Sequence, residues 1–182
     1  MRSYSPTALL TGALLLITAA CGYAAGAVHY APAQATRTEL AQATDPAGAR
    51  GRTLGLSRVT IPAHTRLGLH RHPGTQIAYI QRGTLTYTVR TGVVSVYRGP
   101  ADENPELVRR VAAGQTAKVR AGEWVIEPPS SVHFGANQGD KQVRILLATL
   151  FKTGRPSSIP VTEGESQCAN VAACVQSARR EG

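Results

Sequence analysis

The feature that most constrains the fold of this chain is the short spacing of its turn-forming residues. Between residues 53 and 152, apolar runs of a few residues each are separated by turns that contain glycine or proline. The expected strands are Leu54–Ile61, Leu67–His72, Ile77–Gln81, Leu85–Arg90, Val93–Tyr97, Thr116–Val119, Trp124–Ile126 and Val143–Phe151. This spacing predicts an all-β sandwich or barrel.

Composition and alternation support a single β-domain. The 182 residues include 18 Gly and 11 Pro, and only 17% are charged, which is low for a helical protein. Leu85, Tyr87 and Val89 share one face of their strand, as do Val143 and Ile145, so we expect these side chains in the core. The polar stretch 98–106 is expected to be a loop between two strands.

The net charge of +9 raises the question of nucleic-acid binding. The basic residues are scattered, with only two adjacent pairs, Arg109-Arg110 and Arg179-Arg180, and no basic stripe with interleaved aromatic residues occurs. We therefore expect no nucleic-acid partner. A solvated basic surface, which would also favour anionic membranes or acidic ligands, is the better explanation.

The first residues carry the pattern of an export signal. Arg2 is followed by the apolar run Ala8–Ile17, and no further charge occurs before Arg37. Cys21 follows Thr18-Ala19-Ala20, which resembles a bacterial lipobox except that Thr18 replaces the usual Leu. Lipidation of Cys21 is therefore one hypothesis.

Two other fates of the N-terminus remain open. Cleavage could occur at the small-residue site Ala25-Gly26-Ala27, or residues 7–28 could stay as a membrane anchor. All three hypotheses place the body of the protein outside the cytoplasm, as a cell-envelope lipoprotein or a secreted protein.

The cysteines fit an oxidising compartment. Cys168 and Cys174 lie close together near the C-terminus, and a disulfide between them with Cys21 lipidated would account for all three thiols. The alternative is two free, exposed thiols. We divide the chain into a signal (1–21), a flexible spacer (22–52), a barrel (53–152) and a C-terminal tail (153–182) with a short helix over 169–179.

Candidate metal ligands begin with His70-Arg71-His72. On a strand, side chains at i and i+2 project from the same face, so both imidazoles could ligate one ion. Taken alone, such a pair is weak evidence, because two exposed or hydrogen-bonded histidines would fit it equally well.

The surrounding residues make the pair more specific. The segment from His70 to Gly83 resembles the first cupin motif, G-x5-H-x-H-x3/4-E-x6-G, with His70, His72 and Gly83 at fixed positions. It departs from that motif twice: His64 stands where the leading Gly belongs, and Gln76 stands where the Glu belongs.

A second segment completes the resemblance. Gly122, Pro128, His133 and Asn137 match the second cupin motif, G-x5-P-x-G-x2-H-x3-N, and only Ser130 departs from it. The chain is therefore identified as similar to small single-domain cupins of the type-2 kind over residues 53–152. This resemblance implies a double-stranded β-helix, or jelly-roll barrel, with a metal ion inside.

The resemblance also implies the ligands. His70, His72 and His133 would bind through imidazole nitrogen and Gln76 through its amide oxygen, which suits one divalent transition metal such as Zn, Fe, Mn, Ni or Cu. Gln76 carries no charge where the motif has Glu, so the site has one negative charge less. We therefore expect the bound metal to be a stronger Lewis acid and the site to bind hard ions such as Mn²⁺ more weakly. The alternative is a vestigial barrel whose histidines bind no metal.

Other polar and aromatic residues are expected to have ordinary roles. Glu123 and Glu127 are expected to be surface carboxylates, and His29 and His64 to be exposed. The aromatic candidates for a pocket are more simply explained as core; they are Tyr79, Tyr87, Trp124 and Phe134.

Two classes of function follow. One is a metal-dependent enzyme, an oxygenase or isomerase, acting on a small oxygen-rich or aromatic molecule; the other is a non-catalytic module that binds a small molecule or metal outside the membrane. No nucleophile elbow or phosphate-binding glycine loop occurs, so hydrolysis by a nucleophilic serine and nucleotide use have no support. A homodimer is compatible with either class.

Overall fold

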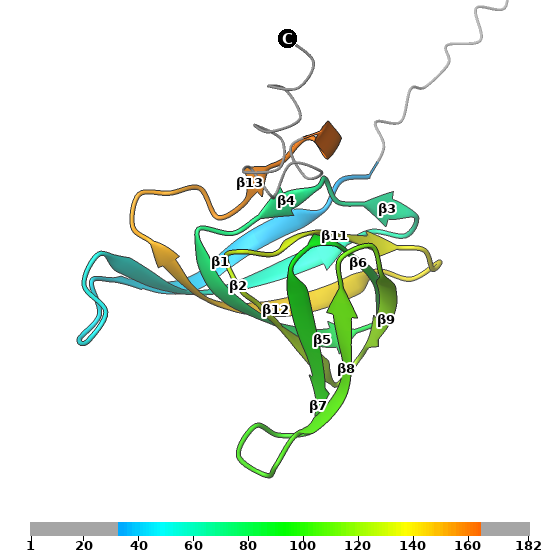
Figure 1. Ribbon diagram of the computed structural model, residues 1–182, viewed down its shortest axis with the longest axis horizontal. Helices are drawn as coiled ribbons and strands as arrows, with labels where there is room; N and C mark the ends of the chain where they lie inside the picture. Colours follow the sequence, from blue (N-terminus) through cyan, green and yellow to red (C-terminus); the bar gives the residue numbers. More distant parts are fainter. Residues whose placement is uncertain (1–32, 165–182) are drawn as a thin grey trace, which may run out of the picture. The chain divides into compact units, whose positions relative to one another are not determined.

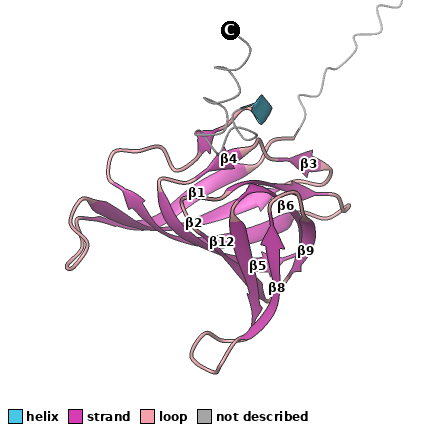
Figure 2. Cartoon of the chain, viewed as in Figure 1, coloured by secondary structure: helices cyan, strands magenta, loops and turns pink. Residues whose placement is uncertain are grey.

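The computed structural model describes residues 33–164. The elements in this range are thirteen β-strands (Figure 1, Figure 2). Their bounds are β1 Thr36–Thr44, β2 Arg52–Ile61, β3 Thr65–Arg66, β4 His70–Arg71, β5 Gly74–Arg82, β6 Thr84–Thr91, β7 Val93–Arg98, β8 Glu106–Ala112, β9 Thr116–Arg120, β10 Glu123–Glu127, β11 Val132–Asn137, β12 Val143–Lys152 and β13 Ile159–Pro160. The prediction of an all-β chain is confirmed.

The strands form two antiparallel sheets with a core between them. The seven-stranded sheet has the order β1-β2-β12-β5-β10-β7-β8, and the six-stranded sheet contains β13-β4-β11-β6-β9 with β3 paired to β11. The chain crosses repeatedly between the sheets, for example from β5 in the first to β6 in the second and back to β7. This is the double-stranded β-helix that the motifs implied.

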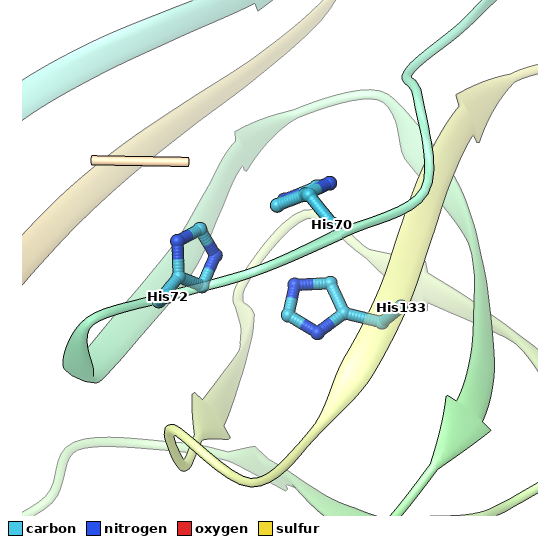
Figure 3. Close-up of side chains that lie close together, drawn as sticks. All are labelled: His70, His72 and His133. Carbon is cyan, nitrogen blue, oxygen red and sulfur yellow. The ribbon is translucent and has the colours of Figure 1, made fainter. Parts of the chain in front are cut away.

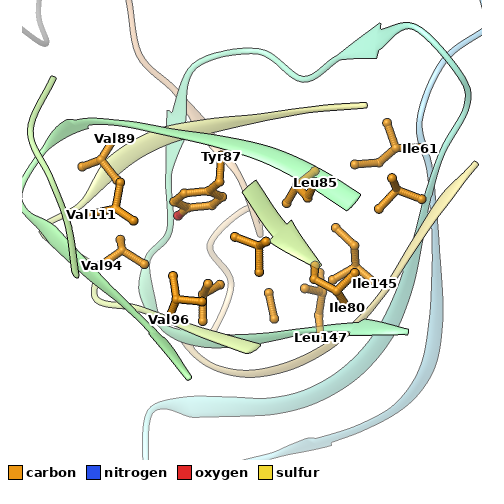
Figure 4. Packing of buried hydrophobic residues seen from close by; sticks show 14 residues of the cluster. Ile61, Ile80, Leu85, Tyr87, Val89, Val94, Val96, Val111, Ile145 and Leu147 are labelled. Atoms are coloured by element: carbon orange, nitrogen blue, oxygen red, sulfur yellow. The ribbon is translucent and has the colours of Figure 1, made fainter. Parts of the chain in front are cut away.

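The core lies where the inward faces of both sheets meet (Figure 4). Leu85, Tyr87 and Val89 of β6 are buried, as are Val143 and Ile145 of β12, so the alternation identified the inner faces correctly. The rest of the cluster comprises Ile61, Ala78, Ile80, Val94, Val96, Val111, Val119, Val125 and Leu147. Each large aliphatic side chain buried here contributes about 1.5–3 kcal/mol to folding.

Five strands were not expected from the sequence: β1, β3, β8, β11 and β13. β1 and β8 are the two edges of the larger sheet; nearly all residues of β1 are exposed, and one residue of β8 is buried. An edge strand with polar side chains on both faces lacks the apolar alternation by which strands are recognised. Of the expected strand Leu67–His72 only His70–Arg71 is a strand, β4, although the Leu67 N–H donates to the Gly135 carbonyl of β11.

Ordered structure begins upstream of the expected boundary at Thr53. β1 pairs with β2 along its length, from Thr36 opposite Thr60 to Thr44 opposite Thr53, so at least this part of the expected spacer belongs to the barrel. The backbone bonds of the ladder hold the segment in place without an apolar pattern.

The expected tail also begins with ordered structure. Ile159 and Pro160 form β13 opposite Arg71 and His70, and the Val161 N–H donates to the Leu69 carbonyl. The export segment with Cys21, the spacer residue His29, the cysteines 168 and 174 and the expected helix 169–179 lie outside the described residues. Among residues 33–164 there is no helix long and apolar enough to cross a membrane.

Candidate metal centre

Three imidazoles converge inside the barrel near one end (Figure 3). His70 lies on β4, His72 follows two residues later, and His133 lies on β11 directly opposite His70 in the ladder. The ring centroids are 4.9 Å apart for His70 and His72, 4.7 Å for His70 and His133, and 5.1 Å for His72 and His133. One nitrogen from each ring lies within 4.8 Å of the other two, so the three rings could hold one ion.

The backbone next to the pair of histidines is fixed by a close strand contact. Gly74, two residues after His72, opens β5 opposite Phe151 of β12. A Cβ atom at Gly74 would overlap the Leu150 carbonyl oxygen, so only glycine permits this approach. The position of His72 therefore depends on the packing of β5 against β12.

Hydrogen bonds on the far side of each ring determine which nitrogen is available. The Nδ1 atoms of His70 and His72 bond the carbonyls of Gly68 and Ser157, each at 2.7 Å, and a carbonyl can only accept. Nδ1 must therefore carry the proton, and Nε2 keeps its lone pair in the neutral ring. Ser157 lies in the segment that was expected to be tail.

The third ring follows the same rule. The Ser131 hydroxyl donates to the Pro128 carbonyl at 2.9 Å, so its oxygen is left to accept from His133 Nδ1 at 3.3 Å. All three Nε2 atoms are then free to act as ligands. Partners that fix the tautomer in this way are typical of metal-binding histidines.

A carboxylate that the sequence analysis assigned to the surface lies among these rings. Glu127 is 3% exposed, its Oε2 is 3.3 Å from His72 Nε2, and its Oε1 is 3.6 Å from His133 Nε2. The expectation was wrong because Glu127 shares the inward face of β10 with Val125, and the neighbouring residues 124 and 126 take the outer face. Alternation about Val125 is the signal that could have found it.

Gln76 lies beside Glu127, since the two residues are cross-strand partners on β5 and β10. Its side-chain nitrogen donates to Glu127 Oε2 and is 3.2 Å from His72 Nε2. Its oxygen, Oε1, is buried and has no hydrogen-bond partner. The structure thus brings Gln76 to the three histidines as expected, with its nitrogen rather than its oxygen toward His72 and Glu127.

Aromatic rings pack against two of the imidazoles. Tyr87 stacks on His133 with centroids 5.1 Å apart, and Phe151 stacks on His72 at 5.4 Å. Burial raises the pKa of the Tyr87 hydroxyl well above its usual value, and the adjacent Glu127 charge raises it further. Tyr87 is therefore a neutral, protonated group beside the carboxylate.

Protonation states in the site suit a cation. Burial lowers the pKa of His133 to about 4 against the opposing effect of Glu127, and burial also lowers the pKa of His70. Burial opposes ionisation of Glu127, but interactions with His133, His72 and Tyr87 outweigh it and lower its pKa to about 2. At neutral pH these groups present neutral nitrogens and one anionic oxygen pair, which is the form that binds metals.

The site opens into a small cavity of about 90 Å³. Its walls are mainly apolar, from Val59, Leu67, Leu85, Ile145 and Leu147 among others. A shallower pocket of about 270 Å³ shares Arg37, Val59, Leu67 and His70 with it, so the two spaces adjoin.

Arg37 is a second residue that the sequence analysis did not identify. It is the one partly buried position of β1 and lines both spaces. Its Nε donates to Glu39 at 2.6 Å, and its side chain remains 25% exposed. No sequence signal identified it, because β1 carries no apolar alternation.

The remaining candidates lie away from the histidines. His64 is exposed as expected and bonds Asp140 at 3.0 Å. Tyr79 and Trp124 were expected in the core, but they border an outer pocket of about 520 Å³. Phe134 lies under the Arg66 guanidinium, 4.0 Å from the ring centroid.

The residues present fit a transition metal. Three Nε2 lone pairs converge, each ring is oriented by a partner on its other nitrogen, and a buried carboxylate faces two of them. Buried charges in proteins are normally paired or coordinate a metal.

Comparison with known proteins agrees with this architecture. The family model described as Cupin matches residues 29–172. A search among curated protein sequences found no match.

Solved structures are similar at low identity. A cupin 2 domain-containing protein from Halorhodospira halophila is 16% identical, with a TM-score of 0.47 over 81% of this chain and 82% of that one. The polyketide cyclase RemF from Streptomyces resistomycificus is 18% identical, with a TM-score of 0.46 over 71% and 72%. A cupin superfamily protein from Desulfitobacterium hafniense is 14% identical, with a TM-score of 0.43 over 65% and 78%.

Proposed function

This chain belongs to the cupin family, and from that premise we propose that it binds one divalent transition metal through His70, His72 and His133 and uses it to act on a small molecule. The observation that carries the proposal is the convergence of one nitrogen from each of the three imidazoles, with the rings oriented by Gly68, Ser157 and Ser131.

A metal bound there would act as a Lewis acid and polarise an oxygen of a bound molecule. The chain's own residues set the surroundings of that molecule. Aliphatic walls exclude water, and the Tyr87 hydroxyl can donate a hydrogen bond because it stays protonated. Glu127 is ionised and lies beside the imidazoles, so it places a negative charge next to a bound cation.

This arrangement favours an enzyme over a binding module. The sequence offered no general base near the metal ligands, whereas the fold brings a buried, ionised carboxylate to them. An oxygenase or isomerase of a small oxygen-rich molecule is therefore the proposed class. A module that only binds its ligand remains the alternative outcome of the test below.

Arg37 supports an anionic substrate. The inner cavity takes only a small group, and Arg37 borders both the cavity and the pocket outside it. Its Nε is used by Glu39, but the two terminal nitrogens of a guanidinium can pair with a carboxylate. We propose a small carboxylic acid that reaches the site past Arg37.

Metal binding is the first test. Metal-free protein titrated with Zn²⁺ or Mn²⁺ should take up about one ion per chain, and the bound ion should raise the unfolding free energy by about 2.7 kcal/mol at a free concentration of 100 times Kd. The variant His133→Ala should bind much more weakly. No uptake by folded wild-type protein would overturn the proposal.

Turnover is the second test. The metal-loaded protein is assayed on small hydroxy acids and keto acids beside their neutral amides, with oxygen uptake and product analysis as readouts. Acids should be preferred, and Arg37→Gln should remove the preference without changing metal content. Binding of the acids without turnover would favour the non-catalytic module.

The exported location stays a proposal that rests on the N-terminal residues alone. Mass spectrometry of protein from its native cell should find the body outside the cytoplasm, with Cys21 acylated or the chain cut near residue 27, and should find Cys168 bonded to Cys174. A protein body found in the cytoplasm would exclude all three forms of the hypothesis.

A further inference from the structure

We propose that Glu127 supplies a carboxylate ligand to the metal in place of residue 76, and that Gln76 holds this carboxylate through its amide nitrogen. The inference rests on the proposed function, because it names a further ligand of the same ion. It concerns a residue of β10 that lies outside the fixed positions of both motifs.

The pairing of β5 with β10 explains how a carboxylate on either strand can occupy the same place in the site. Gln76 and Glu127 face each other across β5 and β10, and residues opposite each other in an antiparallel pair point to the same side with Cβ atoms about 4.5–5.5 Å apart. A carboxylate on either residue therefore reaches the same space. In this chain that space is next to the His72 and His133 rings.

The distances agree with a shared ion. Ligand atoms that lie about 2.0–2.2 Å from a metal in a tetrahedral site are about 3.4 Å from one another. Glu127 Oε2 is 3.3 Å from His72 Nε2, and Oε1 is 3.6 Å from His133 Nε2. In the neutral rings both imidazole nitrogens carry lone pairs, so the carboxylate then faces two acceptors, and a cation between the three groups would attract all of them.

The charge of Glu127 also lacks a permanent partner. Within residues 33–164 no Lys or Arg forms an ion pair with it; its contacts are imidazoles, the Gln76 amide and the Tyr87 hydroxyl. An unpaired buried carboxylate costs several kcal/mol, which a divalent ion would offset.

The orientation of Gln76 follows from its neighbours. Glu127 when ionised and His72 Nε2 can only accept hydrogen bonds, so the group of Gln76 that faces them must be the NH₂. One N–H holds Glu127 Oε2. The second N–H of the Gln76 amide points at the Nε2 lone pair of His72. A bound metal would use that lone pair instead. A glutamate at 76 would instead place a second carboxylate against Glu127, and the two charges would repel.

A carboxylate swap tests the inference. Zn²⁺ and Mn²⁺ affinities are measured by isothermal titration for wild type, Glu127→Gln, Gln76→Glu and the double variant Gln76→Glu with Glu127→Gln. We expect Glu127→Gln to bind at least about tenfold more weakly. The double variant should recover most of the loss, because it returns one carboxylate to the same space, and Gln76→Glu alone should not tighten binding.

Glu123→Gln is the matched control. It makes the same chemical change at a buried position of the same strand, but Glu123 bonds arginines and not the histidines, so metal affinity should stay at the wild-type value. The Cu²⁺ spectrum in electron paramagnetic resonance gives a second readout. Its hyperfine pattern should change in Glu127→Gln and return toward the wild-type pattern in the swap.

The outcomes separate this inference from the proposed function. If folded wild-type protein binds no metal, the proposed function fails. If wild type binds and His133→Ala weakens binding, but Glu127→Gln binds as tightly with an unchanged Cu²⁺ spectrum, only the role of Glu127 is overturned. Tighter binding by Gln76→Glu alone would return the ligand role to position 76.

Discussion

Two buried carboxylates on one strand differ in what surrounds them. Glu123 and Glu127 are the first and last residues of β10, on the same inward face, and they are 1% and 3% exposed. Glu123 accepts bonds from Arg98 at 2.7 Å, Arg109 at 3.3 Å and the Arg120 backbone N–H at 2.9 Å. Glu127 accepts one bond from the uncharged Gln76 amide and faces two imidazoles, those of His72 and His133.

The difference teaches how to distinguish a structural from a functional buried charge. Burial opposes ionisation of Glu123, but the Arg120 N–H and the two arginines outweigh it and lower its pKa, so its charge is compensated within the fold. The pKa of Glu127 is also lowered, but by imidazoles and the Tyr87 hydroxyl, so no arginine or lysine of residues 33–164 faces it with a permanent positive charge. Burial alone would have classed the two residues together.

The largest expected effect on stability comes from removing Glu123, the carboxylate whose charge is compensated by arginines. Glu123→Ala leaves the Arg120 N–H unpaired and two arginines without their partner, so the unfolding free energy of the metal-free protein should fall by about 3 kcal/mol. Urea unfolding measures it, and Arg109→Gln should cost less because Arg98 remains. A loss below about 1 kcal/mol would mean that Glu123 is not a structural anchor.

Acidification should lower the stability of the folded protein through the groups around Glu127, at the other end of β10. The pKa of His133 is about 4 in the folded chain and 6.5 in an unfolded one, so the unfolded state binds more protons between these values. Stability is then present above pH 6.5 and is lost as the pH falls toward 4, by an amount on the order of 2 kcal/mol.

Thermal unfolding of metal-free protein between pH 7 and pH 4 checks this prediction. The variant His133→Gln, in which this position cannot titrate, should show a flatter profile above pH 4.5. An identical profile in the variant would place the pH sensitivity elsewhere in the chain.

The smallest expected effect is the most informative. At pH 7 without metal, Glu127→Gln should change the unfolding free energy by less than about 1 kcal/mol or increase it, because the substitution removes a buried charge that no cation balances. The Glu123→Gln variant should lose stability under the same conditions. If both variants lost several kcal/mol, the two carboxylates would be equivalent and the comparison would fail.

The sequence predicted the fold from its inner strands. β2, β5, β6, β7 and β12 carry apolar alternation or apolar runs, and each was expected within a few residues of its observed bounds. Edge strands such as β1 bury too few side chains for an apolar alternation to appear in the sequence. Local spacing therefore found the five inner strands of the larger sheet and missed its two edges, β1 and β8, and it also missed β11 in the middle of the smaller sheet.

The site was predicted as far as its histidines. His70, His72 and His133 lie in two motifs, and the structure brings them together as expected. Glu127 could not be placed by motif, because its role depends on which residue faces it across β5, and register between strands far apart in sequence is not visible in a single chain. A buried acid also contradicts the usual preference of carboxylates for the surface.

The pairing of β1 with β2 bears on where a working fragment of this protein can begin. A recombinant protein started at Thr53 would lack β1 and leave the outer edge of β2 with unpaired N–H and C=O groups, which invite association with another strand. It would also lose Arg37 and with it one wall of the entrance to the cavity. Any processing that leaves the domain intact must therefore cut the chain upstream of Thr36.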